Sequence, residues 1–183
     1  MVGIVQDNYI KRNNIVMRLC SINDAEFIIS LRTDSILKRH ISQTDNDLNK
    51  QKKWIELYKV REKNNQEYYF IIEDENEERW GTYRIYNLTQ NHFTIGSWLC
   101  KRDAPKNIAI KADILMKDFG YDYLKYNLCR FDVRKNNRKV LKYHKLFEPK
   151  LINEDELNYY FEIDTEKYYK NRDKICILFG IKV

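Results

Sequence analysis

The stretch FTIGSWLCKRDAPKNIAIKADILMKDFGYDYLKYNLCRFDVRKNNRKVLKYHKLF, residues 93–147, decides the fold. Its apolar and turn residues predict, in order, a strand, a loop containing Pro105, a helix, a second strand and a second helix, with the elements over 93–100, 108–126, 129–134 and 137–147. The loop leads directly into the first helix, where the first backbone N–H groups have no acceptor within the helix. This helix start therefore predicts an anion-binding site.

The flanking sequence also alternates between strands and helices. Further strands are expected over 15–20, 67–73, 81–88, 157–163 and 175–183, and further helices over 25–32, 47–62 and 165–172. Three strands between residues 67 and 100 indicate an antiparallel meander, whereas the strands separated by helices indicate crossover connections. The mixture predicts a single α/β (α+β) domain over residues 1–183. We expect the mostly polar residues 1–14 to form a flexible N-terminal arm.

Charge limits the kind of partner. The 183-residue chain has 33 Lys and Arg residues and 27 Asp and Glu residues, for a formal net charge of +6. A basic balance suits a phosphorylated ligand or a nucleic acid, and a merely solvated surface explains it equally. Acidic residues interleave with the basic ones, so the sequence lacks a compact basic block. We therefore expect no nucleic-acid partner.

The four cysteines, Cys20, Cys100, Cys129 and Cys176, lie in apolar runs that indicate strands. They form no C-x-x-C pair and have no histidine at metal-ligand spacing, so we expect no metal site. Buried free thiols fit a reducing, cytoplasmic compartment. The polar N-terminus lacks a signal peptide's apolar stretch, and no run approaches the roughly 20 apolar residues of a membrane helix, so we expect no membrane partner.

The order of elements in residues 93–147 resembles the acyl-CoA-binding half of the GNAT acetyltransferases. The resemblance implies a GNAT-like domain with a central, mixed and mostly antiparallel sheet flanked by helices, and acetyl-CoA as cosubstrate. In the family, a Gly-rich loop holds the CoA pyrophosphate. Here that loop is Ala104-Pro105-Lys106-Asn107-Ile108-Ala109, in which only Ala109 matches and Asn107 occupies a glycine position. Asn is the residue that best tolerates left-handed backbone geometry after glycine.

The resemblance implies that this loop binds CoA through backbone N–H groups and one lysine side chain, with Lys106, Asn107, Ile108, Ala109 and Ile110 as the candidates. A plain strand-to-helix turn explains the loop equally. On the preceding strand, the resemblance implies that a backbone N–H near Leu99 or Cys100 binds the thioester oxygen. No histidine adjacent in sequence could activate the Cys100 thiol, so we do not expect a cysteine nucleophile.

GNAT proteins often carry an asparagine after the next strand and a tyrosine seven positions later. Anchoring on Asn137 implies that it binds CoA and that His144 replaces the tyrosine. His144 would then protonate the departing thiolate, since the ordinary pKa of histidine, about 6.5, lies near cellular pH. Anchoring on Asn136 instead makes Tyr143 the proton donor. Glu148-Pro149 departs from the Gly-Phe that follows in the family.

A structural role for His144 is the alternative. Val140, Tyr143, His144 and Phe147 lie at i, i+3, i+4 and i+7, which is the spacing of a buried helical stripe. A lone histidine on such a stripe is often a core residue, so the position alone does not separate the two roles.

The acceptor is implied by a narrower similarity. The stretches DAEFIISLR (24–32), QKKWI (51–55), GSW (96–98) and FDVRK (131–135) are similar to GNAT proteins of bacterial surface-polysaccharide gene clusters. The similarity implies a nucleotide-linked amino sugar, whose amine attacks the thioester directly in a ternary complex. Aromatic and arginine side chains can stack on a sugar or base and bind a diphosphate, although a core role is the simpler one for each aromatic residue. The candidates are Gln51, Arg61, Tyr69, Arg84 and Trp98.

Other assignments stay open at this point. Glu62 and Glu67 are candidate bases for the amine, a water relay is an alternative, and Asp132 is expected to be structural. The chain also resembles, more distantly, the ribosomal-protein N-terminal acetyltransferases, which would make the acceptor a polypeptide. A CoA-binding domain without catalysis is a third alternative, and a homodimer is compatible with each.

Overall fold

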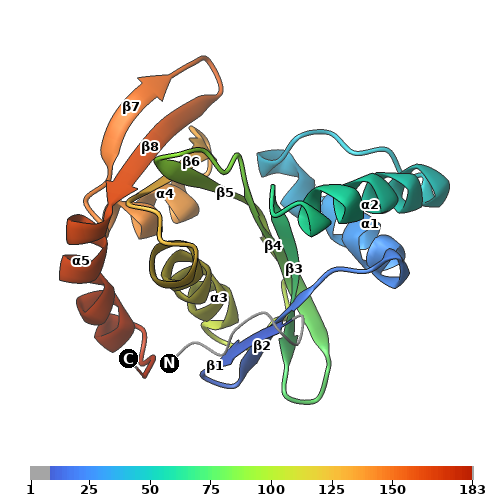
Figure 1. The fold of residues 1–183 in the computed structure, drawn as a ribbon, viewed down its shortest axis with the longest axis horizontal. Helices are drawn as coiled ribbons and strands as arrows, with labels where there is room; N and C mark the ends of the chain where they lie inside the picture. The colour runs from blue at the N-terminus through green and yellow to red at the C-terminus, as the bar shows by residue number, and fades with distance from the viewer. Residues whose placement is uncertain (1–8, 183) are drawn as a thin grey trace.

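The structure, a computed structural model, describes residues 9–182 as one β-sheet between two layers of helices (Figure 1). The strands are β1 (Tyr9–Arg12), β2 (Ile15–Leu19), β3 (Tyr68–Asp74), β4 (Arg79–Tyr86), β5 (His92–Cys100), β6 (Leu128–Arg134), β7 (Lys150–Glu154) and β8 (Asn158–Asp164). The helices are α1 (Ala25–Thr33), α2 (Leu48–Lys63), α3 (Ile108–Asp118), α4 (Arg138–Lys145) and α5 (Thr165–Leu178). The predicted single α/β domain is confirmed.

The strand order is β1-β2-β3-β4-β5-β6-β8-β7. All neighbouring strands are antiparallel except β5 and β6, which run parallel because α3 connects them as a crossover. The predicted meander is formed by β3, β4 and β5, and the mixed, mostly antiparallel sheet is confirmed.

Two hydrophobic clusters hold the layers together. Helices α1 and α2 cover one face of the sheet, while α3, α4 and α5 lie on the other (Figure 1). Strand β3 contributes to both clusters, because Phe70 and Ile72 face one side and Tyr69 and Ile71 face the other. Fully burying a large apolar side chain stabilises the fold by roughly 1.5–3 kcal/mol. This explains why β3 is almost continuously apolar.

The C-terminal segment corrects one prediction. Residues 175–183 were expected to form a strand, but α5 continues through Leu178. Its buried residues lie at i, i+3, i+7 and i+8, namely Tyr168, Asn171, Ile175 and Cys176. That spacing is helical, and it places Cys176 in a helix rather than in a strand.

Two strands were missed. Tyr9–Arg12 pairs with β2 as strand β1, so this part of the expected flexible arm is ordered, and residues 1–8 lie outside the described residues. All five residues of β7 are exposed, which leaves no apolar alternation by which the sequence could reveal it. The predicted helix over 108–126 is α3 followed by a π-helical turn at Phe119–Tyr123.

Candidate functional site

Strands β5 and β6 separate in the middle of the sheet. They pair over only three positions, from His92–Leu128 to Thr94–Arg130, although both strands continue further. Beyond that point the space between them opens into a cleft of about 1130 Å³, lined by 95–100 of β5 and 131–134 of β6. Because β6 pairs with β8 along its whole length, its separation from β5 does not leave it unsupported.

A bulge shapes the β5 wall of this cleft. The register between β4 and β5 shifts near Ser97, whose φ is +47°, and the Thr82 hydroxyl donates to the Ser97 carbonyl at 2.8 Å. Further along, the Lys101 N–H donates to the Trp80 carbonyl at 2.7 Å. Successive amides of a strand point to opposite edges, so the N–H of Cys100 points away from β4 and toward the open side.

This geometry favours Cys100 over Leu99 as the donor to a thioester oxygen. Both residues line the cleft. Gly81 of β4 permits the close approach of the two strands, since a Cβ there would lie 2.2 Å from the Leu99 carbonyl oxygen. Burial raises the pKa of the Cys100 thiol to about 12, so the thiol stays protonated and is a poor nucleophile.

The loop into α3 has the expected backbone geometry. Asn107 adopts φ +66°, the left-handed conformation anticipated for a glycine position, and its Nδ2 donates to the Phe179 carbonyl at 2.5 Å. The Ile108 N–H donates to the Pro105 carbonyl at 3.1 Å, and the side chain of the N-cap residue Asn107 does not cap α3. The remaining amides of the first turn can therefore serve an anion. Residues 104–109, including Lys106 and Ala109, line the cleft, whereas Ile110 does not.

Helix α4 begins on the opposite wall. Asn137 is its N-cap, because its side-chain oxygen accepts from the Val140 N–H at 3.4 Å. Both residues line the cleft. Asn137 thus has a structural role in addition to any ligand contact, and the cap leaves its side-chain NH₂ group available.

His144 lies at the cleft but is poorly suited to donate a proton. It is 4% exposed and packs against Phe131, with ring centroids 4.4 Å apart. Burial, with the positive charge of Lys117, lowers the pKa of His144 to about 3. The imidazole is therefore neutral at cellular pH. These surroundings do not favour His144 as the proton donor to a thiolate, and that role stays a prediction.

Tyr143 is directed into the core. Its hydroxyl donates to Asp113 Oδ2 at 2.6 Å, and Tyr143 is absent from the residues that line the cleft. Burial and the Asp113 charge hold the pKa of Tyr143 well above its ordinary value. The Tyr143 hydroxyl already has a buried carboxylate as acceptor, so this geometry does not favour Tyr143 as the proton donor, and that role stays a prediction.

The acceptor half of the cleft gathers four of the five predicted residues, namely Gln51, Tyr69, Arg84 and Trp98. Arg61 does not line the cleft, and its Nε donates instead to Glu67 at 2.7 Å. Arg84 also pairs with Glu67. The Arg84 guanidinium lies 5.3 Å from the Trp54 ring centroid, within cation–π range.

The two candidate bases are engaged elsewhere. Glu67 accepts from both arginines, and Glu62 accepts from Tyr58 and Lys59. Neither glutamate lines the cleft. Both carboxylates form ion pairs around α2, so this geometry does not favour either glutamate as the base for an amine in the cleft.

Polar atoms without partners gather in the cleft. Among residues 9–182, the buried side-chain atoms that lack a hydrogen bond are Arg84 Nε, Trp98 Nε1, His144 Nδ1 and Asn158 Oδ1. All four residues line the cleft. A buried polar group without a hydrogen-bond partner costs free energy. Such atoms therefore indicate that a ligand or a water molecule forms the missing hydrogen bonds. Asn158 was missed because only the pairing of β8 with β6 brings it here.

The segment between α1 and α2 reaches across to the other wall. His40 Nδ1 lies 3.1 Å from Asn136 Oδ1, in the turn between β6 and α4. Residues 40–44 line the cleft beside this contact. The contact links the acceptor half to the α4 wall, so a ligand in the cleft is bordered by both halves of the chain.

Comparison with known proteins identifies the architecture. A family model described as "Acetyltransferase (GNAT) domain" matches residues 14–145. The chain belongs to the GNAT acetyltransferase family. Its fold and family make it an N-acetyltransferase. A sequence comparison of this acetyltransferase with curated proteins gave no significant match.

Solved GNAT structures share its fold. Apo FdhC, a nucleotide-linked sugar GNAT, is 35% identical with a TM-score of 0.82, over 93% of this acetyltransferase and 97% of FdhC. Ribosomal-protein-S5-alanine acetyltransferase from Vibrio fischeri is 16% identical with a TM-score of 0.74, over 86% and 97% of the chains. Spermidine N-acetyltransferase from Vibrio cholerae, solved with CoA and spermine, is 15% identical with a TM-score of 0.73, over 86% and 99%. The last two show the fold alone.

Two further properties bear on ligands of this acetyltransferase. Within residues 9–182, none of the helices is both long enough and apolar enough to cross a lipid bilayer. The same residues contain no group of three or more His, Cys, Asp or Glu side chains placed to hold a metal ion.

Proposed function

We propose that this GNAT protein transfers the acetyl group of acetyl-CoA to the primary amine of a nucleotide-linked amino sugar. The observation that carries the proposal is the 35% identity to FdhC, a nucleotide-linked sugar GNAT, over 93% of the chain. The acceptor half supports it, because Trp54, Tyr69 and Trp98 offer aromatic surface and Arg84 offers a guanidinium beside them. These groups suit a base, a sugar and a diphosphate.

The cleft fits acetyl-CoA at the opposite end. The uncapped start of α3 and the side chain of Lys106 provide N–H groups and charge for the pyrophosphate. The separated strands then receive the pantetheine arm, and the Cys100 N–H is directed at the developing oxyanion of the thioester. Both substrates occupy one cleft, so the amine attacks directly in a ternary complex. Holding the reactants together removes much of the entropic barrier.

A thiol-release assay tests the proposal. Acetyl-CoA is offered with a panel of nucleotide-linked amino sugars, aminoglycosides and N-terminal peptides. We expect turnover with at least one amino-sugar nucleotide, and a KM for it that rises with salt as screening weakens the contact with its diphosphate. Acetylation of peptide N-termini with no turnover of any amino-sugar nucleotide would refute the proposed acceptor and favour a ribosomal-protein-like activity.

The cosubstrate is tested separately. Isothermal calorimetry should detect CoA binding to the native protein. Asn137→Ala should weaken it by about 1–3 kcal/mol if the side-chain amide bonds CoA in a buried setting. Because Asn137 also caps α4, Asn137→Ser serves as the control, since it keeps a neutral capping oxygen and lacks the free NH₂ group. Absence of CoA binding by the native protein would end this assignment.

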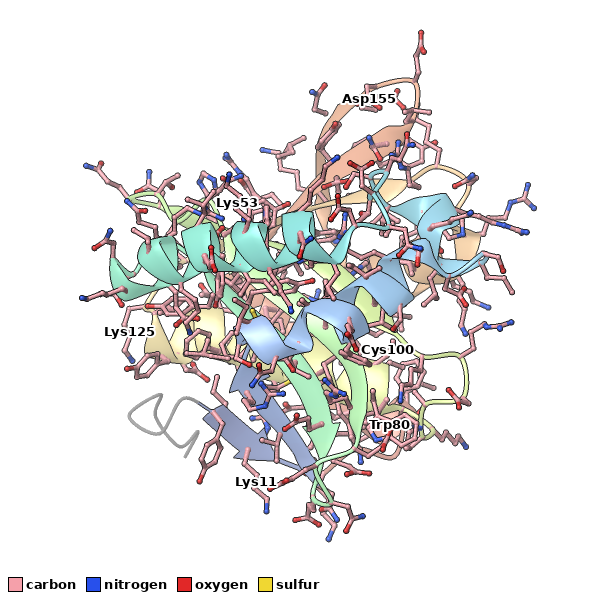
Figure 2. All side chains as sticks on the ribbon, turned by 90° about the vertical axis from the view of Figure 1, so that its right-hand side faces the viewer. Lys11, Lys53, Trp80, Cys100, Lys125 and Asp155 are labelled. Carbon is pink, nitrogen blue, oxygen red and sulfur yellow. The ribbon has the colours of Figure 1, made fainter. Side chains whose placement is uncertain are left out.

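The homodimer stays a proposal. The β7–β8 hairpin projects beyond the rest of the sheet, with Asp155 near its tip (Figure 2). It exposes Leu151, Ile152 and Leu157, and among the described strands β7 lies at the edge of the sheet, with β8 as its neighbour. Exposed apolar groups on an edge strand favour association with another chain. Light scattering after size exclusion, with Leu157→Lys as the variant, tests whether the protein is dimeric through this hairpin.

A further inference from the structure

The charges that line the cleft are strongly unequal. Lysine and arginine side chains come from both walls, including Arg32, Arg84, Arg134 and Lys139. Among the described residues that line it, Asp132 is the only carboxylate. A basic cleft suits the phosphates of both proposed substrates, but it repels the positive charge of an ammonium group. One negative group in such surroundings is therefore the natural contact for an amine.

Asp132 also differs from the other acidic residues near the cleft. Glu62 and Glu67 are occupied by ion pairs, and Asp113 accepts hydrogen bonds from two tyrosines in the core. Apart from its own backbone N–H, the Asp132 carboxylate has no hydrogen-bond or ion-pair partner among residues 9–182, although the charge of Arg134 is nearby on the same strand. A carboxylate without a side-chain partner is available to a ligand.

The backbone places Asp132 at the point where the strands separate. Strand β6 alternates, with Phe131 and Val133 buried and Asp132 exposed on the opposite face. The parallel register pairs Thr94 with Arg130, so two residues further Asp132 lies level with Gly96, at the start of the β5 bulge. The carboxylate thus lies level with the residue that precedes the bulge, just beyond the last paired positions of β5 and β6.

We propose that Asp132 binds the ammonium group of the acceptor and removes its proton. This assignment rests on the proposed transfer of an acetyl group to an amine. The Asp132 carboxylate takes one proton from R–NH₃⁺, which leaves the amine lone pair free. The nitrogen attacks the thioester carbon, a C–N bond forms and the C=O electrons move to the oxygen. When the carbonyl re-forms, the C–S bond breaks.

After the attack the nitrogen still carries two protons, one of which stays on the product as the amide N–H. The other goes to the leaving thiolate, directly or through water, which gives CoA–SH and the amide. The proton on Asp132 is released to solvent, and the carboxylate is restored for the next cycle. This route requires no imidazolium at His144 and no hydroxyl proton from Tyr143, in agreement with the surroundings of both side chains.

The surroundings of Asp132 make it a stronger base than an ordinary aspartate. Partial removal from water raises its pKa, and nearby Asp155 adds to the rise while Arg134 opposes it. Tyr86 of β4 and Tyr160 of β8 also face the carboxylate, and burial and the negative charge of Asp132 raise the pKa of Tyr86. The acidic limb of the pH profile of kcat/KM should therefore lie above the ordinary aspartate pKa of about 3.9.

The test compares three variants with the native enzyme on the best amine from the panel. Asp132→Asn keeps the volume but cannot accept a proton, so kcat should fall by about 10²–10⁴-fold. CoA affinity by calorimetry and the melting temperature should stay near native. Raising the pH should partly restore Asp132→Asn, because a growing fraction of the amine then arrives unprotonated. Asp132→Glu should keep an acidic limb with intermediate activity.

Glu166→Gln is the matched control. Glu166 is an exposed carboxylate in the first turn of α5, and it does not line the cleft. Its removal should leave kcat and the pH profile unchanged. If Asp132→Asn were to lose its melting transition, Asp132→Glu decides instead, and a native pH profile with native kcat in that variant would overturn the assignment.

The outcomes separate the two proposals. A native enzyme that acetylates an amino-sugar nucleotide, together with an Asp132→Asn variant of near-native kcat and pH profile, would overturn the role of Asp132 and leave the proposed function standing. A native enzyme active only on another amine, with Asp132→Asn still impaired, would refute the proposed acceptor and support Asp132.

Discussion

Two polar regions meet at α4, because Tyr143 belongs to the network around Asp113 and His144 lines the cleft, and they differ in whether their polar atoms have partners. In the core, Asp113 accepts from Tyr83 and Tyr143 at 2.6 Å each and pairs with Lys117, and none of these side chains is more than 8% exposed. In the cleft, four buried polar atoms have no partner among residues 9–182. A buried polar group whose hydrogen bonds are made within the chain stabilises the fold. A buried polar group without a hydrogen bond is available to bind a ligand.

The core region fixes the cleft wall. Tyr83 comes from β4 and Tyr143 from α4, so their shared acceptor on α3 joins three elements. Between them lies Trp98, with ring centroids 6.1 Å from Tyr83 and 5.5 Å from Tyr143. Burial alone would raise the pKa of Asp113, but Lys117 and its hydrogen-bond donors hold it below its usual value. The hydrogen bonds around Asp113 therefore hold β4, α3 and α4 together, and these elements support the part of the cleft wall that contains Trp98.

The largest effect is expected from breaking the buried pair. Asp113→Asn leaves the fully buried Lys117 without its counter-charge, and removal of one partner of a buried pair costs about 3–5 kcal/mol. Chemical denaturation measures the loss. The double variant Asp113→Asn/Lys117→Met should recover part of it, because no buried charge remains. A loss below about 1 kcal/mol for the single variant would contradict a closed core network.

The second prediction distinguishes a structural role of the Tyr143 hydroxyl from a catalytic one. Tyr143→Phe removes a hydrogen bond to a charged acceptor, which should lower the free energy of unfolding by about 1.5–3 kcal/mol. The kcat of the folded variant should stay within a few-fold of native. Tyr83→Phe is the matched control, because its hydroxyl contacts the same carboxylate. A large fall in kcat for Tyr143→Phe alone, at native stability, would show that this hydroxyl serves the cleft.

The third prediction concerns His144, which lines the cleft beside the core network, and the pH dependence that it gives to protein stability. Its pKa is lowered to about 3 in the fold, against about 6.5 in the unfolded chain, so the unfolded state binds a proton first as the pH falls. The contribution of His144 to the free energy of unfolding is complete well above the unfolded-state pKa of about 6.5 and declines as the pH falls below it. The free energy of unfolding should therefore drop by about 2 kcal/mol between pH 7 and pH 5. Urea denaturation at both pH values, for native protein and His144→Gln, isolates the difference. Equal pH dependence of the two proteins would contradict a buried neutral imidazole.

The smallest effect is expected in the loop that precedes α3, at the edge of the cleft. Asn107→Gly keeps φ +66° accessible and loses only the contact with the Phe179 carbonyl, so stability should change by less than about 1 kcal/mol. CoA affinity by calorimetry should stay near native. Asn107→Val should cost more, about 1–3 kcal/mol, because a β-branched residue is strained there. Equal effects of the two substitutions would show that the left-handed conformation is not needed.

Local patterns predicted much of the fold. Strand and helix spacing identified the order of elements over residues 93–147, and Asn107 was expected in the left-handed conformation that it adopts. The patterns failed where exposure removes alternation, as in β7, and where a short apolar run fits two periods, as at Ile175. The stripe of α4 showed that Tyr143 and His144 face inward, but not which atoms they meet.

The sequence by itself determined the alternation of strands and helices, the family resemblance and the residue types near each wall, because these depend on short-range periodicity and turn chemistry. Tertiary structure alone decided how far β5 and β6 stay paired and which carboxylates form ion pairs. It also decided that Asp132 lies in the cleft without a side-chain partner among residues 9–182. Those properties depend on contacts between residues far apart in the chain. The pKa of a side chain and the availability of its polar atoms follow from such contacts, and no local pattern carries them.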